Sequence, residues 1–492
     1  MAVDYLVMTG YLLGLVGAGW WGKKRAASKS EFLVAGRRLG PLMYTGTMAA
    51  IVLGGASTVG GVGLGYSYGI SGAAMVFAIG LGLLALSIFF SARIARLRVY
   101  TVAEMLSLRY GDAASVISGV VMWMYTLMLV VTSTIAYASV FDVLFDVPRW
   151  AAIVIGGTIV VGYSVLGGMW SITLTDMVQF VVKSVGVLLL LLPIAVVKAG
   201  GFAAMGDQLP HGYLSPTSIG GQTIFTYVLI YTFGMLIGQD IWQRVFTARS
   251  EKVAVWGGTA AGAFCLVYAL AGAFIGMATK VLHPRLASAD QAFAAIVKHT
   301  LPPGIKGLVL AAALSAMMST ASGALIASAT VANNDIWARL RRLGRHKAEA
   351  AADPEESDEV ASNRLAIAIL GVTSMAIACA LGDVMAALTA AYDMLVGGLL
   401  IPILGGLVWR RGNLQGALTS MVVGGTTVIT FMVTDGLLAN EPIYYGLLAS
   451  LVAYVTVSLV TKPTEEAVVE GWRRRVAGES AGTSAAPATT TV

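Results

Sequence analysis

The chain has 492 residues, of which 57% are hydrophobic and only 12% are charged, and its mean hydropathy is +0.80. A soluble domain has about 25% charged residues, so this chain lacks about half of the charge that a water-exposed surface needs. The composition excludes a soluble enzyme, and it excludes a nucleic-acid-binding protein despite the net charge of +6. It predicts an all-α integral membrane protein embedded in the lipid bilayer.

Redox and metal chemistry within the membrane are not expected. Cys265 and Cys379 each lie inside an apolar run, which is not the spacing of a disulfide framework or a metal cluster. A haem-carrying membrane subunit needs imidazole ligands inside its helices. The four histidines instead fall between apolar runs: His211, His283, His299 and His346. We therefore expect no organic cofactor.

Apolar runs of about 20 residues, the length that crosses a bilayer, predict thirteen transmembrane helices. They cover residues 3–21, 42–69, 72–95, 115–141, 149–168, 173–198, 221–239, 253–281, 305–335, 363–382, 385–409, 414–435 and 442–461. If the N-terminus is outside, 25 of the 32 Lys and Arg residues lie in cytoplasmic segments. Because basic residues gather in cytoplasmic loops, we predict a multi-pass plasma-membrane protein with an external N-terminus and a cytoplasmic C-terminus.

Two of the predicted helices contain glycines that favour an interruption. Residues 54–65 hold six glycines, and each weakens a helix by about 1 kcal/mol relative to alanine. Residues 233–238, five helices later, are interrupted by glycine as well. Unwound backbone at membrane depth is tolerated where it faces a cavity or a ligand. The alternative for the first run is a small-residue packing face, which Gly61 and Gly65 would serve.

Broken helices at matching positions of two halves are typical of inverted-repeat transporters. The sequence therefore predicts a 5+5 inverted repeat with two broken helices, and a substrate near the midplane between the breaks. The predicted divisions are an N-terminal extra helix and basic loop (1–41), the first repeat (42–198), the second repeat (199–409), two peripheral C-terminal helices (410–462) and a partly disordered cytoplasmic tail (463–492).

Hydroxyl side chains follow one face of the ninth predicted helix. Ser315, Ser319 and Ser322 are spaced i, i+4, i+7, with Thr320 beside them. Neutral hydroxyls combined with free carbonyls suit a monovalent cation such as sodium, because divalent ions generally recruit carboxylates. Rows of Ser, Ala and Gly also serve helix packing, so this pattern alone leaves both interpretations open.

Five short motifs, in order along the chain, resemble the sodium/solute symporter family: Glu31–Arg37, Gly167–Trp170, Thr175–Gln179, Gln239–Arg244 and Met318–Ser322. The resemblance implies the ten-helix core also found in the bacterial leucine transporter. It implies a secondary transporter that couples sodium entry to uptake of a small organic solute. It also implies a sodium site formed by Ala50, Leu53, Ala316, Ser319 and Thr320.

In some family members a second sodium binds near the acid of the Thr-Asp motif, and the resemblance transfers this site to Asp176 and Ser322. Gly323 stands where a further hydroxyl would be, so Asp176 is alternatively part of the cytoplasmic exit path. The family's sugar-binding pattern is absent, because Gly238 replaces an Asn and Ala56-Ser57 replace a Glu-Gln pair.

The preferred substrate is an amino acid or a monocarboxylate, because free N–H groups at the start of a half-helix favour an anionic end. The expected substrate contacts are Gly54, Gly55, Ala56, Ser57, Thr58, Tyr231, Gly238 and Gln239. Four aromatic residues are alternatively packing residues or a cage for a quaternary ammonium group: Trp123, Tyr125, Tyr231 and Phe233.

Lys183 lies within the sixth predicted helix, where a lysine needs a partner or a function. Three interpretations remain open: an ion pair with an acid such as Asp393, a contact to an anionic substrate, or a cation that replaces sodium. In the last case the transporter is proton-coupled or sodium-independent. A transporter-like membrane sensor is a second alternative, although residues after 462 do not predict an output domain. The oligomeric state is not predicted.

Overall fold

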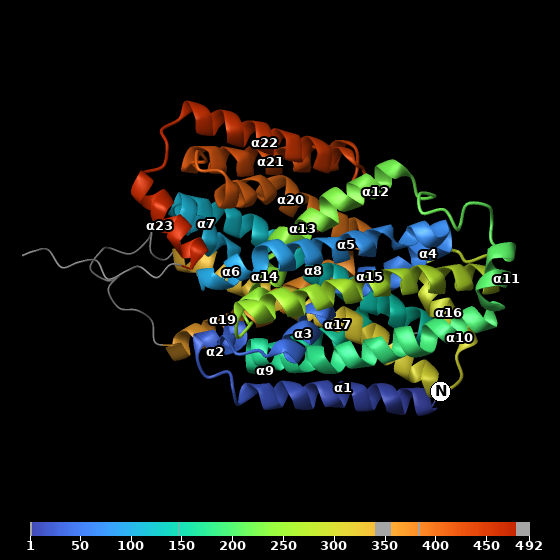
Figure 1. Cartoon of the computed structure of the whole chain (residues 1–492). Coiled ribbons are helices and arrows are strands. Elements are labelled where there is room, and N and C mark those ends of the chain that lie inside the picture. Colours follow the sequence, from blue (N-terminus) through green and yellow to red (C-terminus); the bar gives the residue numbers. More distant parts are fainter. Residues whose placement is uncertain (1, 146, 340–355, 382–383, 479–492) are drawn as a thin grey trace, which may run out of the picture.

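The computed structural model describes residues 2–145, 147–339, 356–381 and 384–478. Within these ranges the chain is almost entirely helical, and the β contact present is one isolated bridge between Leu39 and Ala248. The long helices lie side by side, with their axes roughly parallel, in a single bundle (Figure 1). The all-α prediction is therefore confirmed.

The elements are α-helices of varied length and short 3₁₀- or π-helical segments, and segments of both of these short types are labelled η. In chain order they are α1 (Ala2–Lys23), α2 (Lys29–Val34), η1 (Ala35–Arg37), α3 (Pro41–Val52), η2 (Ala56–Gly60), α4 (Gly61–Tyr68), η3 (Gly69–Ala73), α5 (Ala74–Ala85), η4 (Leu86–Phe90), α6 (Ser91–Leu97), α7 (Val102–Tyr110), α8 (Asp112–Phe145), α9 (Arg149–Lys183), η5 (Ser184–Leu191), α10 (Leu192–Lys198), α11 (Gly201–Gln208), α12 (Gly221–Tyr227), η6 (Val228–Thr232), α13 (Phe233–Ile237), α14 (Gln239–Val245), α15 (Glu251–Leu282), η7 (Ala289–Gln291), α16 (Ala292–Thr300), α17 (Ile305–Val331), η8 (Ala332–Trp337), α19 (Glu356–Ala380), α20 (Val384–Val408), α21 (Leu414–Thr434), α22 (Glu441–Val460) and α23 (Glu466–Ala477).

Ten helical segments of the described chain are long and apolar enough to cross a membrane, or eleven when the bent pair Gly221–Ile237 and Gln239–Val245 counts as one span. The structure thus supports a multi-pass membrane protein, but this count does not reach the predicted thirteen. Two of the ten segments contain a glycine in the left-handed region, Gly69 with φ +67° and Gly168 with φ +51°.

Helix α17 forms the centre of the bundle. Its most apolar window is entirely buried, and it packs against α8, α9 and α1. Its Ala, Ser and Gly residues allow neighbouring backbones to approach closely, as small residues do in membrane bundles. The hydroxyl face predicted for this helix is therefore inside the protein and not against lipid.

Peripheral helices flank this centre on two sides. Helix α1 packs against α9, and α21 and α22 pack against each other and against α20 on the opposite side (Figure 1). Elements α2, α7 and α23 lie at one end of the bundle, and the N-terminal end of α1 lies at the other. The predicted tail is partly helical, since it contains α23, and residues 479–492 lie outside the described chain.

Candidate ion and substrate site

The helix predicted to break near Gly54 is interrupted in the structure. Helix α3 ends at Val52, Leu53 has non-helical angles (φ −94°, ψ 71°), and helical structure resumes at Ala56. The break packs directly onto α17: a Cβ added to Gly54 would lie 2.5 Å from Thr320 Oγ1. Glycine is therefore required here by the close approach of the two segments.

The second predicted break lies at Gly238. The segments on either side of it meet at 44°, and Gly238 itself is extended (φ −62°, ψ 129°). A Cβ on Gly238 would lie 2.9 Å from Asp240 Oδ1 and 3.1 Å from Tyr125 Oη. The absence of a side chain leaves room for the contact between these two groups.

The residues predicted to hold a cation come together at the first break. Ser319 Oγ donates to Ala50 O at 2.8 Å, and Thr320 Oγ1 donates to Ile51 O at 2.6 Å. Both hydroxyls also contact Ala316 O, at 3.1 Å and 3.4 Å. The end of α3 and the hydroxyl face of α17 therefore form one polar cluster in the interior of the bundle.

Lys183 reaches into the same cluster from α9. Its Nζ donates to Ala50 O at 3.2 Å and to Leu53 O at 3.0 Å, and its side chain is fully buried. The carbonyls of Ala50 and Leu53 are two of the groups that the family resemblance places in a sodium site. The ion pair with Asp393, one of the three interpretations of Lys183, is not formed, since neither Asp393 oxygen has a hydrogen-bond partner in the described structure. Carbonyl oxygens at the helix break satisfy the ammonium group instead.

Asp176, the residue assigned to a second cation or an exit path, already has a protein partner. Its Oδ2 lies 3.2 Å from Arg244 Nη2 and accepts a hydrogen bond from Thr47 Oγ1, and both charged side chains are buried. Gly323 makes room for this pair, because a Cβ there would lie 2.7 Å from Arg244 Nη2. Ser322 Oγ donates to the Ser319 carbonyl at 3.1 Å.

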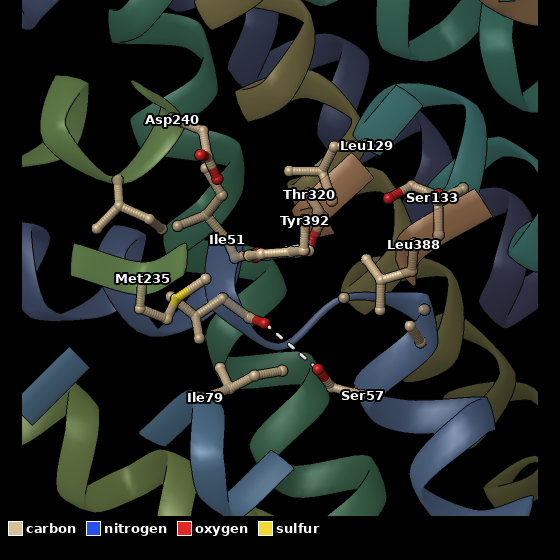
Figure 2. Close-up of a pocket in the computed structure, with 16 residues that line it drawn as sticks. Ile51, Ser57, Ile79, Leu129, Ser133, Met235, Asp240, Thr320, Leu388 and Tyr392 are labelled. Atoms are coloured by element: carbon tan, nitrogen blue, oxygen red, sulfur yellow. Dashed lines mark hydrogen bonds between the residues drawn. The ribbon is translucent and has the colours of Figure 1, made fainter. Parts of the chain in front are cut away.

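A cavity lies at the first break, beside this polar cluster (Figure 2). In this view Asp240, Thr320 and Tyr392 lie above the break and Ser57 lies below it, where its hydroxyl donates to Val52 O. The lining comes from α3, η2, α5, α8, α13, α14, α17 and α20: Ile51, Val52, Gly54, Gly55, Ala56, Ser57, Ile79, Leu129, Thr132, Ser133, Met235, Asp240, Ile241, Thr320, Leu388 and Tyr392.

Four of the eight expected substrate contacts, Gly54 to Ser57, line this cavity. The other four do not line it: Thr58, Tyr231, Gly238 and Gln239. The Thr58 hydroxyl lies 2.9 Å from Tyr268 Oη, and the Gln239 side chain bonds to the backbone of Tyr100 and Val102. Both polar groups are therefore satisfied by protein partners elsewhere.

None of the four aromatic candidates lines the cavity, but two of them contact Tyr392, which does. Tyr125 and Tyr231 each meet the ring of Tyr392 edge-on, with centroids 5.3 Å apart. Trp123 and Phe233 are not among the cavity-lining residues. Sequence reasoning gave no substrate role to Asp240 or Tyr392. An acid inside a membrane helix is by itself a signal for a functional site, and that signal would have identified Asp240.

The chain is similar to known transporters over nearly its whole length. It is 25% identical over 489 residues to sodium/proline symporters of Staphylococcus aureus strains, covering 93% of this chain and 93% of the relative. Among solved structures, a Na+-coupled sialic acid symporter in a substrate-bound outward-open state matches with a TM-score of 0.82 and 17% identity, covering 94% of this chain and 98% of that chain.

A nucleobase-cation-symport-1 family transporter, Mhp1 in a closed conformation, matches with a TM-score of 0.59 and 16% identity, covering 91% of this chain and 98% of that chain. Both structures support the fold. The model of the Sodium:solute symporter family matches residues 32–424, which is well over half of the chain. The protein therefore belongs to the Sodium:solute symporter family: it is a membrane transporter and not an enzyme, and sodium is the co-transported ion of its family.

Proposed function

We propose that this chain carries a small organic solute, an amino acid or a monocarboxylate, across the plasma membrane by alternating access. The observation that carries the proposal is the cavity at the break after Val52, which is lined by Gly54–Ser57 and borders the hydroxyls of α17. Irregular backbone at membrane depth that faces a cavity is the usual substrate site of broken-helix transporters.

The proposal includes the 5+5 inverted repeat, with residues 42–198 and 199–409 as its halves. The segments Ala56–Leu97 and Arg149–Lys198 contain 42 and 50 residues. At a rise of about 1.5 Å per residue, straight helices of that length would span about 60–75 Å, twice the thickness of the hydrocarbon core. If the chain reverses its direction near Gly69 and near Gly168, each of these segments crosses the membrane twice. A thirteen-helix arrangement with an external N-terminus and a cytoplasmic C-terminus requires both reversals.

For the cation we propose a site formed by Ala50, Leu53, Ala316, Ser319 and Thr320. Sodium bound there would hold the end of α3 against α17 and so stabilise the form that accepts solute. The coupling is reciprocal, since an ion that tightens solute binding is itself bound more tightly when solute is present. Release of the ion into a cytoplasm low in sodium then drives the cycle forward.

A second candidate follows from one specific contact. The ammonium of Lys183 lies on the carbonyls of Ala50 and Leu53, where the cation is proposed to bind. A lysine that is charged in one half of the cycle and neutral in the other would replace sodium, and the driving ion would be a proton. This candidate keeps the fold, the cavity and the solute class, and it differs only in the coupling ion.

Solute uptake into proteoliposomes tests the proposal and distinguishes the two forms of coupling. Purified full-length protein is first screened against amino acids and monocarboxylates by thermal shift, because a solute that binds only the native state raises the melting temperature. Uptake of each positive solute is then measured with an inward sodium gradient and, separately, with an inward proton gradient in sodium-free buffer. Uptake driven by the sodium gradient supports sodium coupling, as in the family. Uptake driven by the proton gradient alone supports the candidate in which Lys183 replaces sodium. Absence of uptake under both gradients contradicts the proposal.

A further inference from the structure

The cavity at the first break is lined by one formally charged side chain, that of Asp240. Asp240 is the second residue of α14, directly after the break at Gly238, and only 2% of its surface is exposed. The other described lining residues are apolar, glycine, hydroxyl-bearing or, in one case, tyrosine. A solute in this cavity therefore meets a single fixed charge, and that charge is negative.

Asp240 has no ion-pair partner within 4.0 Å among the described residues. Its Oδ1 accepts a hydrogen bond from Tyr125 Oη at 3.0 Å. Arg244, a cation of the same helix α14, pairs with Asp176, and the buried Lys183 donates to carbonyl oxygens. A buried charge is costly unless it is paired, so this carboxylate is suited to receive a cation from outside the protein.

A group of tyrosines lies on the side of the cavity where Asp240 is found. Tyr392 lines the cavity, and its ring lies edge-on to that of Tyr125, the hydrogen-bond donor to Asp240. The ring of Tyr231 also lies edge-on to that of Tyr392. Ring faces attract ammonium groups, most strongly where water is excluded. A carboxylate beside tyrosine rings is a chemical arrangement that binds a protonated amine.

We infer that Asp240 is the specificity-determining residue of the site and that it binds the protonated amine of the solute. This inference rests on the proposed function and deepens it, because it selects amino acids over monocarboxylates. A monocarboxylate in the same cavity would bring a second negative charge close to Asp240, and like charges in a low-dielectric site repel strongly. The ammonium of an amino acid compensates the fixed charge.

The test uses pairs of solutes that differ only in the amine. Suitable pairs are alanine with lactate, leucine with 2-hydroxyisocaproate, and proline with tetrahydrofuran-2-carboxylate. The thermal stabilisation of the purified full-length protein is titrated with each compound. A hydrogen bond to a charged group is strong enough to change affinity by about tenfold or more. We therefore expect at least one amino acid to bind about tenfold or more tightly than its partner compound.

The variant Asp240→Asn should reduce this ratio to about one, because the amide keeps the shape of the side chain and loses its charge. The control Asp393→Asn makes the same change at another buried carboxylate, one that does not line the cavity, and should preserve the ratio. If Asp240→Asn does not give a cooperative melting curve, Tyr125→Phe takes its place. This variant removes only the hydroxyl that holds Asp240, and it should lower the ratio while leaving it above one.

The outcomes separate the inference from the proposed function. Equal binding of an amino acid and its oxygen analogue by the native protein overturns the role of Asp240 and leaves the proposed function intact. An unchanged ratio in Asp240→Asn does the same. If neither class of compound stabilises the native protein, the proposed solute class is wrong and the inference falls with it.

Discussion

Replacement of Lys183 by methionine removes an ammonium group and keeps an unbranched side chain of similar length. The ammonium donates to Ala50 O at 3.2 Å and to Leu53 O at 3.0 Å. In the variant, Ala50 O still accepts from Ser319 Oγ at 2.8 Å, whereas Leu53 O loses the lysine donor. The substitution therefore leaves a carbonyl free for an added cation.

The magnitude follows from these two contacts. A hydrogen bond to a charged group contributes about 1.5–3 kcal/mol. An added cation must replace both bonds of the lysine, so the lysine lowers the binding free energy of that cation by at least about 3 kcal/mol. Because about 1.4 kcal/mol corresponds to a factor of ten in affinity, Lys183→Met should bind sodium about 100-fold more tightly than the native protein. In potassium buffer the unsatisfied Leu53 carbonyl should lower the free energy of unfolding by about 1–3 kcal/mol.

Thermal unfolding measures both effects. Native protein and Lys183→Met are heated in a series of sodium concentrations, with potassium added to keep the ionic strength constant. Sodium at a hundred times its dissociation constant stabilises the native state by about 2.7 kcal/mol. The variant should therefore melt at a lower temperature than the native protein in potassium and regain that difference in sodium. Lys198→Met, at an exposed position in α10, is the matched control and should behave as the native protein does.

Two results would refute this reasoning. If sodium stabilises Lys183→Met no more than the native protein, the lysine does not compete for the cation position. If Ser319→Ala, introduced into Lys183→Met, leaves a gained sodium response unchanged, the ion binds elsewhere.

Three further variants test the polar interior of the bundle. Ser319→Ala combined with Thr320→Ala removes the hydroxyls that contact the α3 carbonyls, and it should abolish cation-dependent solute binding while the melting curve stays cooperative; unchanged cation dependence would argue against the site. Arg244→Gln leaves the buried carboxylate of Asp176 without its charged partner. The variant should lower the free energy of unfolding by about 3–5 kcal/mol, measured by denaturation, and a loss under about 1 kcal/mol would contradict the pairing. Gly54→Ala places a methyl group 2.5 Å from Thr320 Oγ1. It should lower the free energy of unfolding by about 1–3 kcal/mol and abolish solute uptake. The control Gly425→Ala, which has open space around it, should change neither.

The sequence alone was sufficient for the class of protein and for the positions of the breaks. Composition and the length of the apolar runs require a lipid environment, because the chain has too few charged residues to cover a water-exposed surface. Glycine runs predicted interruptions near Gly54 and Gly238, since each glycine adds a helix penalty that is local and readable. The hydroxyl face with Ser319 and Thr320 could be predicted as well, because helical spacing is also a local property of the sequence.

Only the tertiary structure decided which groups share the interior. Asp393 and the carbonyls of Ala50 and Leu53 were all possible partners for Lys183, and choosing among them depends on how α9 packs against the end of α3. Asp240 and Tyr392 are about 150 residues apart in sequence, and both line the cavity beside the break. Periodicity reports the face of one helix, but it carries no information about the distance between side chains on different helices. The contacts on which the proposed cation and solute sites rest are interhelical, and they exist only once the bundle has folded.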